Sequence, residues 1–288
     1  MKVLVVGASG FLGRHIYKHF KAAGNLVTGT FCSNQADPSM IRFDLNMDDL
    51  ESIDDFSEET DKCAILCAAE TRLDTCENER EKSYQINVAS TIRLIEQLKK
   101  RNYYIIFCST ESVYGGKKGN YTENDVADAI NEYGRMKLQI EKYLLDTCFK
   151  GCVFRIGRVV GDAGWPRDIL YGWKKMAVEG KDICCIRGNY FSPVDVADVV
   201  NCLEIACRKK AQGIYNICGD KIYSRSELCY AFLHSLGLQA NIYEKDLAEF
   251  HFNAARPLNI GMRNEKAVKD LEYKFNTMEE VYARYEQV

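Results

Sequence analysis

A tyrosine and a lysine stand four residues apart in the segment Tyr133-Gly134-Arg135-Met136-Lys137. On a helix this spacing places both side chains on one face. A phenol with its ordinary pKa of about 10 is a weak acid–base group at neutral pH, and a neighbouring ammonium group lowers that pKa. A tyrosine tuned in this way could donate a proton to a carbonyl oxygen while a hydride reaches the carbonyl carbon. The spacing is common by chance, so its meaning depends on the surrounding residues.

Two residues with hydroxyl groups, Ser109 and Thr110, directly follow an apolar run over residues 104–108 that we expect to be a strand. Open α/β sheets bind ligands at the carboxyl ends of their strands, where these hydroxyls would lie. Thr110 could therefore hydrogen-bond a substrate oxygen beside Tyr133. Taken alone, the same two residues could equally cap a turn.

The start of the chain carries a different chemistry, a turn that can hold phosphate. An apolar run over residues 2–6 leads into the segment GASGFLG at 7–13, and a helical pattern follows. Gly7 permits the tight turn, Gly10 lets the backbone approach a pyrophosphate, and Gly13 allows the helix to pack closely on the strand. The helix N-terminus supplies free N–H groups and the positive end of its dipole. This strand–turn–helix context predicts dinucleotide binding rather than an ordinary glycine-rich turn.

The end of the second expected strand, residues 25–31, bears on which dinucleotide is bound. No Asp or Glu follows at once to hold the ribose 2′-hydroxyl of NAD. A carboxylate there would repel a 2′-phosphate, so its absence favours NADP, with NAD possible. Ser33, Asn34 and Arg14 could contact the phosphate. Asp44 could accept a hydrogen bond from the adenine amino group, or cap the turn that follows it.

The spacing of apolar residues predicts the elements that position these groups. Short β-branched runs alternate with segments of helical period, which indicates a parallel sheet covered on both faces. We expect strands at 2–6, 25–31, 63–67, 104–108, 151–156, 183–186 and 213–218. We expect helices at 12–22, 82–100, 133–146, 170–178, 195–209, 228–236 and 278–287. Ser224 and Glu227 form a capping box before the helix at 228–236. The fold class is α/β, a doubly wound Rossmann sheet with a smaller α/β substrate-binding domain.

Composition narrows the class of protein. The 288 residues carry a net charge of −3, without the basic excess that nucleic-acid binding needs. No apolar run reaches the roughly 18 to 20 residues of a membrane span, and no signal-peptide pattern is present. We therefore expect a cytoplasmic protein whose 13 cysteines are reduced. Without a C-x-x-C pair or paired histidines we expect no metal site. The cysteines would pack as small apolar residues in the sheet, at Cys63, Cys67, Cys108, Cys152 and Cys218.

Together these residues resemble the extended short-chain dehydrogenase/reductases. The resemblance is carried by Gly7-x-x-Gly10-x-x-Gly13, Asp44-Leu45, Cys67-Ala68-Ala69, Asn87, Ser109-Thr110 and Tyr133-x-x-x-Lys137. Within that superfamily the chain resembles the dTDP-4-dehydrorhamnose reductase (RmlD-like) branch, close to the NAD-dependent epimerases. Segments 153–161 and 191–198 also resemble the superfamily, and the segments that indicate this branch are 68–74 and Arg256-Pro257-Leu258-Asn259.

The resemblance implies an NAD(P)H-dependent reductase acting on a carbonyl of a nucleotide-activated sugar. Tyr133 would donate the proton, Lys137 would bind the nicotinamide ribose and lower the tyrosine pKa, and Thr110 would orient the substrate carbonyl. Implied cofactor contacts are Gly7, Ser9, Gly10, Phe11, Leu12, Gly13, Ser33, Asp44, Leu45, Ala68, Ala69, Thr71, Asn87, Tyr133 and Lys137. Implied substrate contacts are Glu70, Ser109, Arg158 and Arg256. A homodimer is an expectation from the family.

Several positions depart from the family pattern. Sugar-nucleotide dehydratases usually carry T-D-E where this chain has Thr110-Glu111-Ser112, and a serine is a poor acid for expelling a hydroxyl group. This argues against a dehydratase. RmlD-like proteins usually have His at the position of Glu70 and Trp at that of Arg158, which leaves the exact sugar open. Trp165 could replace the missing Trp or anchor a loop.

Three functions remain open at this point: a reductase, a non-catalytic NADP-binding regulatory protein, and an NAD-dependent sugar-nucleotide epimerase. The RmlD-like branch includes a regulatory subunit as well as enzymes. The presence of the hydroxyl residue, the tyrosine and the lysine favours an enzyme. The missing acid after the second strand and the RmlD-like C-terminal part disfavour an epimerase. We expect a Rossmann domain from 1–157 and 188–218, and a substrate-binding domain from 158–187 and 219–288.

Overall fold

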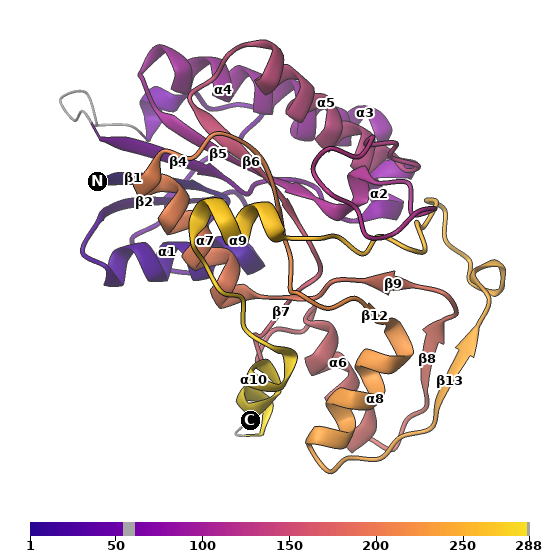
Figure 1. Cartoon of the computed structure of the whole chain (residues 1–288). Helices are drawn as coiled ribbons and strands as arrows, with labels where there is room; N and C mark the ends of the chain where they lie inside the picture. Colours follow the sequence, from indigo (N-terminus) through magenta and orange to yellow (C-terminus); the bar gives the residue numbers. More distant parts are fainter. Residues whose placement is uncertain (54–60, 287–288) are drawn as a thin grey trace.

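The centre of the structure, a computed structural model that describes residues 1–53 and 61–286, is a seven-stranded parallel sheet (Figure 1). Its order is β11-β6-β5-β4-β1-β2-β3. β2 and β3 therefore lie on one side of β1, and the later strands, from β4 onward, lie on its other side. The strands are β1 (Lys2–Val6), β2 (Leu26–Phe31), β3 (Ile41–Arg42), β4 (Lys62–Leu66), β5 (Tyr104–Thr110), β6 (Gly151–Ile156) and β11 (Gly213–Ile217). Because every pairing is parallel, all carboxyl ends meet at one edge. The doubly wound α/β fold expected from the sequence is confirmed.

Helices cover both faces of this sheet, as Figure 1 shows. Alternate residues of β1 point to opposite sides, with Val3 and Val5 in one core and Leu4 and Val6 in the other. The first face is covered by α1 (Phe11–Ala22), α7 (Val196–Lys209) and α9 (Glu265–Leu271). The second face is covered by α4 (Thr91–Lys100) and α5 (Glu132–Asp146).

The helix expected at 82–100 is interrupted by a π-helical turn. It consists of α3 (Arg80–Tyr84), the π turn (Gln85–Ser90) and α4. Asn87 lies in that turn, and its side chain accepts a hydrogen bond from the N–H of Glu70 (2.8 Å) and donates one to the Glu70 carbonyl (2.9 Å). Single π turns occur often at functional sites. Here the turn directs an amide at the segment that follows β4.

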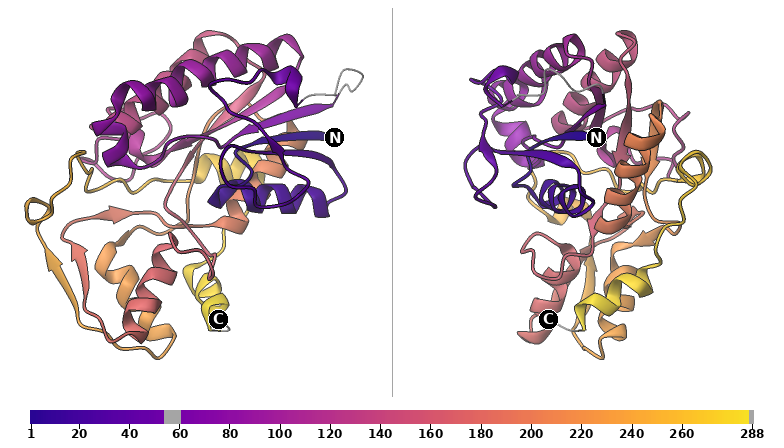
Figure 2. Two further views of the ribbon diagram at one scale, coloured as in Figure 1. Left: turned by 180° about the vertical axis from the view of Figure 1, so that it is seen from behind. Right: turned by 90° about the vertical axis from the view of Figure 1, so that its left-hand side faces the viewer.

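A second group of elements with its own apolar core lies beyond the carboxyl edge of the sheet (Figure 2). Its helices are α6 (Ile169–Val178), α8 (Arg225–Ser235) and α10 (Met278–Tyr282). Its short strands pair as β8 (Ile183–Ile186) with β13 (Ile242–Lys245), and as β9 (Tyr190–Phe191) with β12 (Tyr223–Ser224). β7 (Val159–Val160) pairs with β10 (Val194–Asp195). The capping box before α8 is confirmed, since the N–H of Glu227 donates to the Ser224 hydroxyl (3.1 Å).

One segment that the sequence assigns to the substrate-binding domain packs against the central sheet instead. Ala267, Leu271 and Phe275 join the core between the sheet and α7, although they fall within the 219–288 part assigned to the substrate-binding domain. Ala267 and Leu271 are four residues apart on α9 and share the face that packs against α7 and β11, and Phe275 follows beyond the end of that helix. The domain boundaries at 157, 187 and 218 stay a prediction.

The cysteines lie largely where the strand pattern predicts. Cys63, Cys108 and Cys152 belong to β4, β5 and β6, and Cys67 and Cys218 each stand one residue after a strand. All 13 are free thiols. No helix within residues 1–53 and 61–286 is long and apolar enough to cross a membrane.

Asp168, which is 2% exposed, connects three parts of the second group of elements. One carboxylate oxygen accepts hydrogen bonds from the N–H groups of Leu170 (2.8 Å) and Tyr171 (3.1 Å), which caps α6. The other accepts from the N–H of Gly161 (2.9 Å) and from the hydroxyl of Tyr285 (2.8 Å). The N–H of Asp162 (3.1 Å) donates to that second oxygen as well, so five buried or half-buried donors depend on one side chain.

We predict that Asp168→Ala lowers the free energy of unfolding by about 3 kcal/mol or more, measured by urea denaturation. Loss of a helix cap costs about 1 kcal/mol, and each buried donor left without a partner costs about 1–3 kcal/mol. Thr277→Ala is the matched control, because Thr277 caps α10 at the surface. That change should cost only about 1 kcal/mol. Equal losses in the two variants would contradict the role assigned to Asp168.

Candidate active site

Tyr133 and Lys137 lie on the first turns of α5, at the carboxyl edge of the sheet. The start of α5 is fixed by Asn131, whose side chain accepts from the N–H of Gly134 (2.9 Å) and donates to the carbonyl of Ala255 (3.1 Å). Tyr133 is 9% exposed and Lys137 is 3% exposed. The helix therefore brings the phenol and the ammonium group to one buried face, as the spacing predicts.

The lysine is anchored to the end of β5. Its Nζ donates a hydrogen bond to the carbonyl of Cys108 (2.9 Å) and lies 4.6 Å from the centre of the Phe107 ring. Nζ is 5.9 Å from the centre of the Tyr133 ring. Burial lowers the pKa of Lys137.

Thr110, the last residue of β5, is the hydroxyl partner of Tyr133. Burial raises the pKa of the Tyr133 phenol, although a hydrogen bond with Thr110 and the charge of Arg158 act in the opposite direction. The lowering of this pKa expected from the lysine is therefore not found, because Lys137 faces the Cys108 carbonyl. The phenol stays protonated at neutral pH, which is the form that can donate a proton.

The glycines of the turn at 7–13 let the backbone pack closely at the start of α1. Gly7 has a φ of +89°, and a Cβ there would lie 2.7 Å from the backbone nitrogen of Ala68. A Cβ at Gly13 would lie 2.1 Å from the carbonyl oxygen of Gly7. No side chain caps α1, and its first helical hydrogen bond runs from Arg14 to Gly10. The N–H groups of residues 11–13 are thus available to a phosphate, and the turn fits the pyrophosphate of a dinucleotide.

Of the three residues considered for contact with a 2′-phosphate, two follow β2 and the third has another partner. Ser33 and Asn34 are exposed just beyond β2. Arg14 instead pairs with the Asp162 carboxylate, and its guanidinium lies 4.2 Å from the centre of the Trp165 ring. Trp165 therefore anchors the loop after β7 on α1, which is one of the two roles expected for it.

The segment after β4 lies beside the glycine turn. Ala68 and Ala69 are half-buried and Thr71 is exposed. The carboxylate of Glu70 accepts from Nε (3.0 Å) and Nη2 (2.7 Å) of Arg72, and this hydrogen bonding lowers the pKa of Glu70. The predicted contacts of these residues with a cofactor or substrate stay predictions.

Asp44 and Leu45 follow β3. The Asp44 carboxylate accepts from the N–H of Asn46 (3.0 Å), so it holds its own turn. Leu45 is 8% exposed and packs in the core beneath α4. The sequence left two roles open for Asp44, a contact with adenine and the capping of the turn that follows. The hydrogen bond from Asn46 is a contact of the second kind.

Ser109 points away from Thr110, because neighbouring residues of a strand face opposite sides. Its hydroxyl donates to the buried carboxylate of Glu141. Arg155 also donates to that carboxylate through Nε (3.0 Å) and Nη2 (2.7 Å), and donates through Nη1 to the hydroxyl of Tyr114 (2.9 Å). The substrate contact predicted for Ser109 is therefore not supported by its placement, which is inside a polar network below the site.

The C-terminal part reaches the site through Arg256. Its Nη2 donates to a carboxylate oxygen of Asp74 (2.6 Å) in α2 (Leu73–Asn78). The other oxygen of Asp74 accepts from the N–H groups of Asn253 (3.1 Å) and Ala254 (2.9 Å). Sequence reasoning placed Asp74 in a branch-like motif without recognising it as the partner of Arg256. The exposed Arg158 follows β6, near enough for its charge to act on Tyr133.

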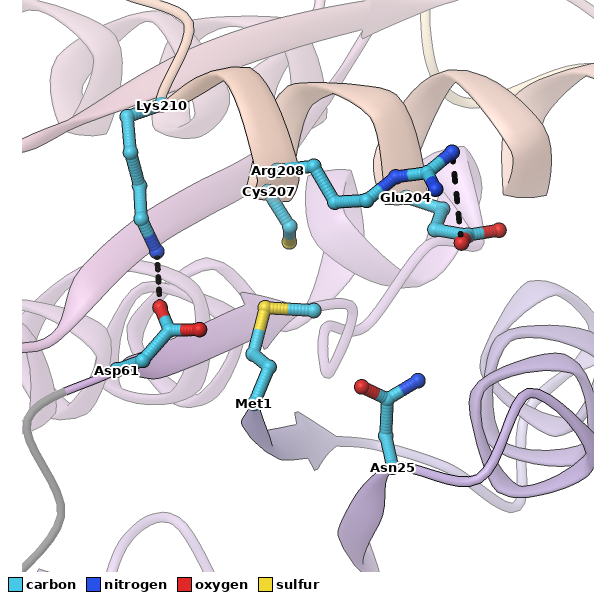
Figure 3. Close-up of a pocket in the computed structure, with 7 residues that line it drawn as sticks. All are labelled: Met1, Asn25, Asp61, Glu204, Cys207, Arg208 and Lys210. Atoms are coloured by element: carbon cyan, nitrogen blue, oxygen red, sulfur yellow. Dashed lines mark hydrogen bonds and ion pairs between the residues drawn. The ribbon is translucent and has the colours of Figure 1, made fainter.

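A pocket of about 320 Å³ lies at the opposite edge of the sheet (Figure 3). Met1, Asn25 and Asp61 line it from the amino ends of strands, and Cys207 lines it from α7. Its charged residues are paired within the pocket, Lys210 with Asp61 at 2.6 Å and Arg208 with Glu204 at 3.6 Å. It shares no residue with the glycine turn or with α5, so it does not belong to the candidate active site.

Comparison with known proteins shows what the whole chain is similar to. The chain is 25% identical over 267 residues to methionine adenosyltransferase 2 subunit beta of Rattus norvegicus. The aligned part covers 90% of this chain and 79% of that protein. The structure of a hypothetical dTDP-4-dehydrorhamnose reductase from Sulfolobus tokodaii is similar, with a TM-score of 0.85 and 27% identity over 96% of this chain and 97% of that one.

A dTDP-4-dehydrorhamnose reductase from Bacillus anthracis in complex with NADP shares the fold, with a TM-score of 0.86 and 20% identity over 99% of this chain and 98% of that one. The family model described as the RmlD substrate binding domain matches residues 1–286. This chain therefore belongs to that family.

Proposed function

We propose that this chain is an NADPH-dependent reductase of a carbonyl on a nucleotide-activated sugar, of the dTDP-4-dehydrorhamnose reductase type. The observation that carries the proposal is the buried phenol of Tyr133, held with the Lys137 ammonium group on one face of α5 at the same sheet edge as the glycine turn. The family match and the similar reductase structure from Sulfolobus tokodaii support it.

In the proposed mechanism, a reduced nicotinamide supplies the hydride when it is bound. Tyr133 donates its proton to the carbonyl oxygen, and Thr110 orients that oxygen. Lys137 would hold the nicotinamide ribose through its ammonium group. Its hydrogen bond to the Cys108 carbonyl keeps the ammonium group at this end of β5.

The proposed cofactor is NADP. The residues directly after β2 include Ser33 and Asn34 and no carboxylate that would repel a 2′-phosphate. The NADP complex of the Bacillus anthracis reductase, which has the same fold, is consistent with this choice. NAD remains the alternative that the cofactor experiment below separates.

A second function is a non-catalytic, NADP-binding regulatory protein. The observation that favours it is the similarity to methionine adenosyltransferase 2 subunit beta over 90% of this chain. Tight NADPH binding without turnover of any carbonyl substrate would support this second function.

We expect Tyr133→Phe to lower the rate of carbonyl reduction by about 10²- to 10⁴-fold, because the variant lacks the proton donor. The assay follows NADPH oxidation with a panel of 4-ketosugar nucleotides. NADPH affinity, measured separately by fluorescence titration, should change little. Tyr143→Phe is the matched control, since Tyr143 is on the same helix and donates its hydroxyl proton to Glu96 (2.6 Å), outside the site. Full activity of Tyr133→Phe would refute the mechanism.

We expect Asn34→Asp to weaken NADPH binding about five- to tenfold while leaving NADH binding nearly unchanged. A carboxylate a few ångströms from a 2′-phosphate adds roughly 1 kcal/mol of repulsion at a solvent-exposed position. Fluorescence titration of both dinucleotides measures the effect. Asn34→Ala separates the loss of the amide from the added charge. An equal loss for NADPH and NADH would show that the 2′-phosphate does not bind here.

A further inference from the structure

Two cysteine side chains meet near the carboxyl ends of the neighbouring strands β4 and β5 (Figure 1). The register of these strands pairs Leu66 with Phe107, so the next residues, Cys67 and Cys108, also stand opposite each other. Their Sγ atoms are 3.5 Å apart. Both side chains point to the face that α1 and α7 cover, since Cys108 belongs to that core and Cys67 packs against it. Two thiols from different strands therefore form one contact.

The spacing of the strands suits a covalent bond between these sulfurs. Neighbouring strands lie about 4.7–4.9 Å apart, and a disulfide joins residues whose Cα atoms are about 4.4–6.8 Å apart. Residues that stand opposite each other in a parallel pair also direct their Cβ atoms to the same face. Rotation of the two side chains would then bring the sulfurs to bonding distance without a change in the sheet.

The cysteine pair lies between the glycine turn and Lys137. The N–H of Cys67 donates to the carbonyl of Val6 (2.9 Å), directly before Gly7. The carbonyl of Cys108 accepts from Nζ of Lys137 (2.9 Å). A dinucleotide that extends from the glycine turn to Lys137 would pass over both cysteines. That course of the dinucleotide rests on the proposed function, whereas the contact between the thiols does not.

Access distinguishes this pair from a second pair of cysteines in the sheet. Cys67 is half-buried and Cys108 is 6% exposed. Cys63 and Cys207, whose Sγ atoms are 2.7 Å apart, are both 0% exposed. The hydrogen bond with Cys108 and burial raise the pKa of Cys67, and the charge of Lys137 acts in the opposite direction. A positive charge beside a cysteine favours the thiolate, which is its reactive form. The pair at the carboxyl edge thus combines a nearby ammonium group with a side chain that solvent reaches.

We propose that Cys67 and Cys108 form a modification site, at which hydrogen peroxide oxidises the two thiols to an intramolecular disulfide and a bound dinucleotide prevents the reaction. The thiolate of one cysteine attacks a peroxide oxygen, the O–O bond breaks, and a sulfenic acid and hydroxide result. The second thiol attacks the sulfenic sulfur, so that the S–S bond forms, the S–O bond breaks and water leaves. In total, two thiols and one peroxide give one disulfide and two water molecules.

The test treats the full chain with hydrogen peroxide, blocks the remaining thiols and maps the tryptic peptides by mass spectrometry without reduction. Trypsin places Cys67 in peptide 63–72 and Cys108 in peptide 102–117. We expect these peptides to appear joined, with the loss of two hydrogen atoms, and to separate after treatment with dithiothreitol. Fragmentation of the joined peptides distinguishes Cys67 from Cys63, which is in the same peptide.

The same reaction in the presence of NADP tests whether a dinucleotide covers the pair. NADP is chosen because, unlike NADPH, it does not reduce the peroxide. With NADP at about ten times its measured dissociation constant, we expect disulfide formation to slow about tenfold, because only the unoccupied protein reacts. An unchanged rate at this occupancy would contradict the protection.

Three variants identify the reacting thiols. Cys67→Ala and Cys108→Ala should each abolish the joined peptides. Cys63→Ala is the matched control, because Cys63 is on the same strand but contacts Cys207, and it should react as the unchanged protein does. If Cys63→Ala does not fold, as judged by circular dichroism, Cys148→Ala replaces it as the control, because Cys148 is exposed.

Two outcomes would overturn the proposal. One is a bond from Cys63 to peptide 188–208, which contains Cys207, with no bond between Cys67 and Cys108. The other is the absence of any joined peptides under conditions that oxidise the exposed Cys148.

Failure of the proposed function is distinguishable from both outcomes. If no carbonyl substrate is reduced but the disulfide forms and NADP slows its formation, the reductase proposal fails and the modification site stands. If titration shows that NADP does not bind, the proposed cofactor and the protection fail together, whereas the disulfide is measured without any dinucleotide.

Discussion

The site depends on how closely α5 packs against the end of β5. Position 134 must be glycine, because a Cβ there would lie 2.2 Å from the carbonyl oxygen of Ser112. Close contact at this point lets Lys137 reach the Cys108 carbonyl and lets Tyr133 meet Thr110. A helix held further out would separate the phenol from the strand that carries its partner. The positions of Tyr133 and Lys137 relative to the end of β5 therefore depend on one backbone contact.

Below this contact, a buried ion pair stabilises both elements. Glu141 on α5 and Arg155 on β6 are each almost fully buried, and their closest atoms are 2.7 Å apart. Ser109 of β5 donates to the same carboxylate, so α5, β5 and β6 meet at a single side chain. Removing one member would leave a buried charge without its partner, which is costly in a low-dielectric interior. The network therefore ties α5 to two strands of the sheet beneath Tyr133 and Lys137.

Much of this organisation could be predicted from local patterns. The alternation Val3, Leu4, Val5, Val6 in a chain of β and α segments indicates a strand buried on both faces, and the spacing of Tyr133 and Lys137 requires only a helix. The interactions that sequence reasoning missed join distant residues. Arg14 pairs with Asp162, 148 residues away. The π turn at 85–90 depends on Asn87 meeting the backbone of Glu70, and the direction of Tyr133's pKa depends on burial that no motif encodes.

The polar groups at the sheet edge come from parts of the chain that are far apart in sequence. Tyr133 and Lys137 stand on α5, Thr110 ends β5, and Arg256 pairs with Asp74 of α2. A parallel sheet brings the carboxyl ends of its strands to one edge, so the segments that follow β4 and β5 gather beside the glycine turn. Binding of a dinucleotide alone would require the glycine turn at this edge, but not a tyrosine and a lysine buried on one face of α5.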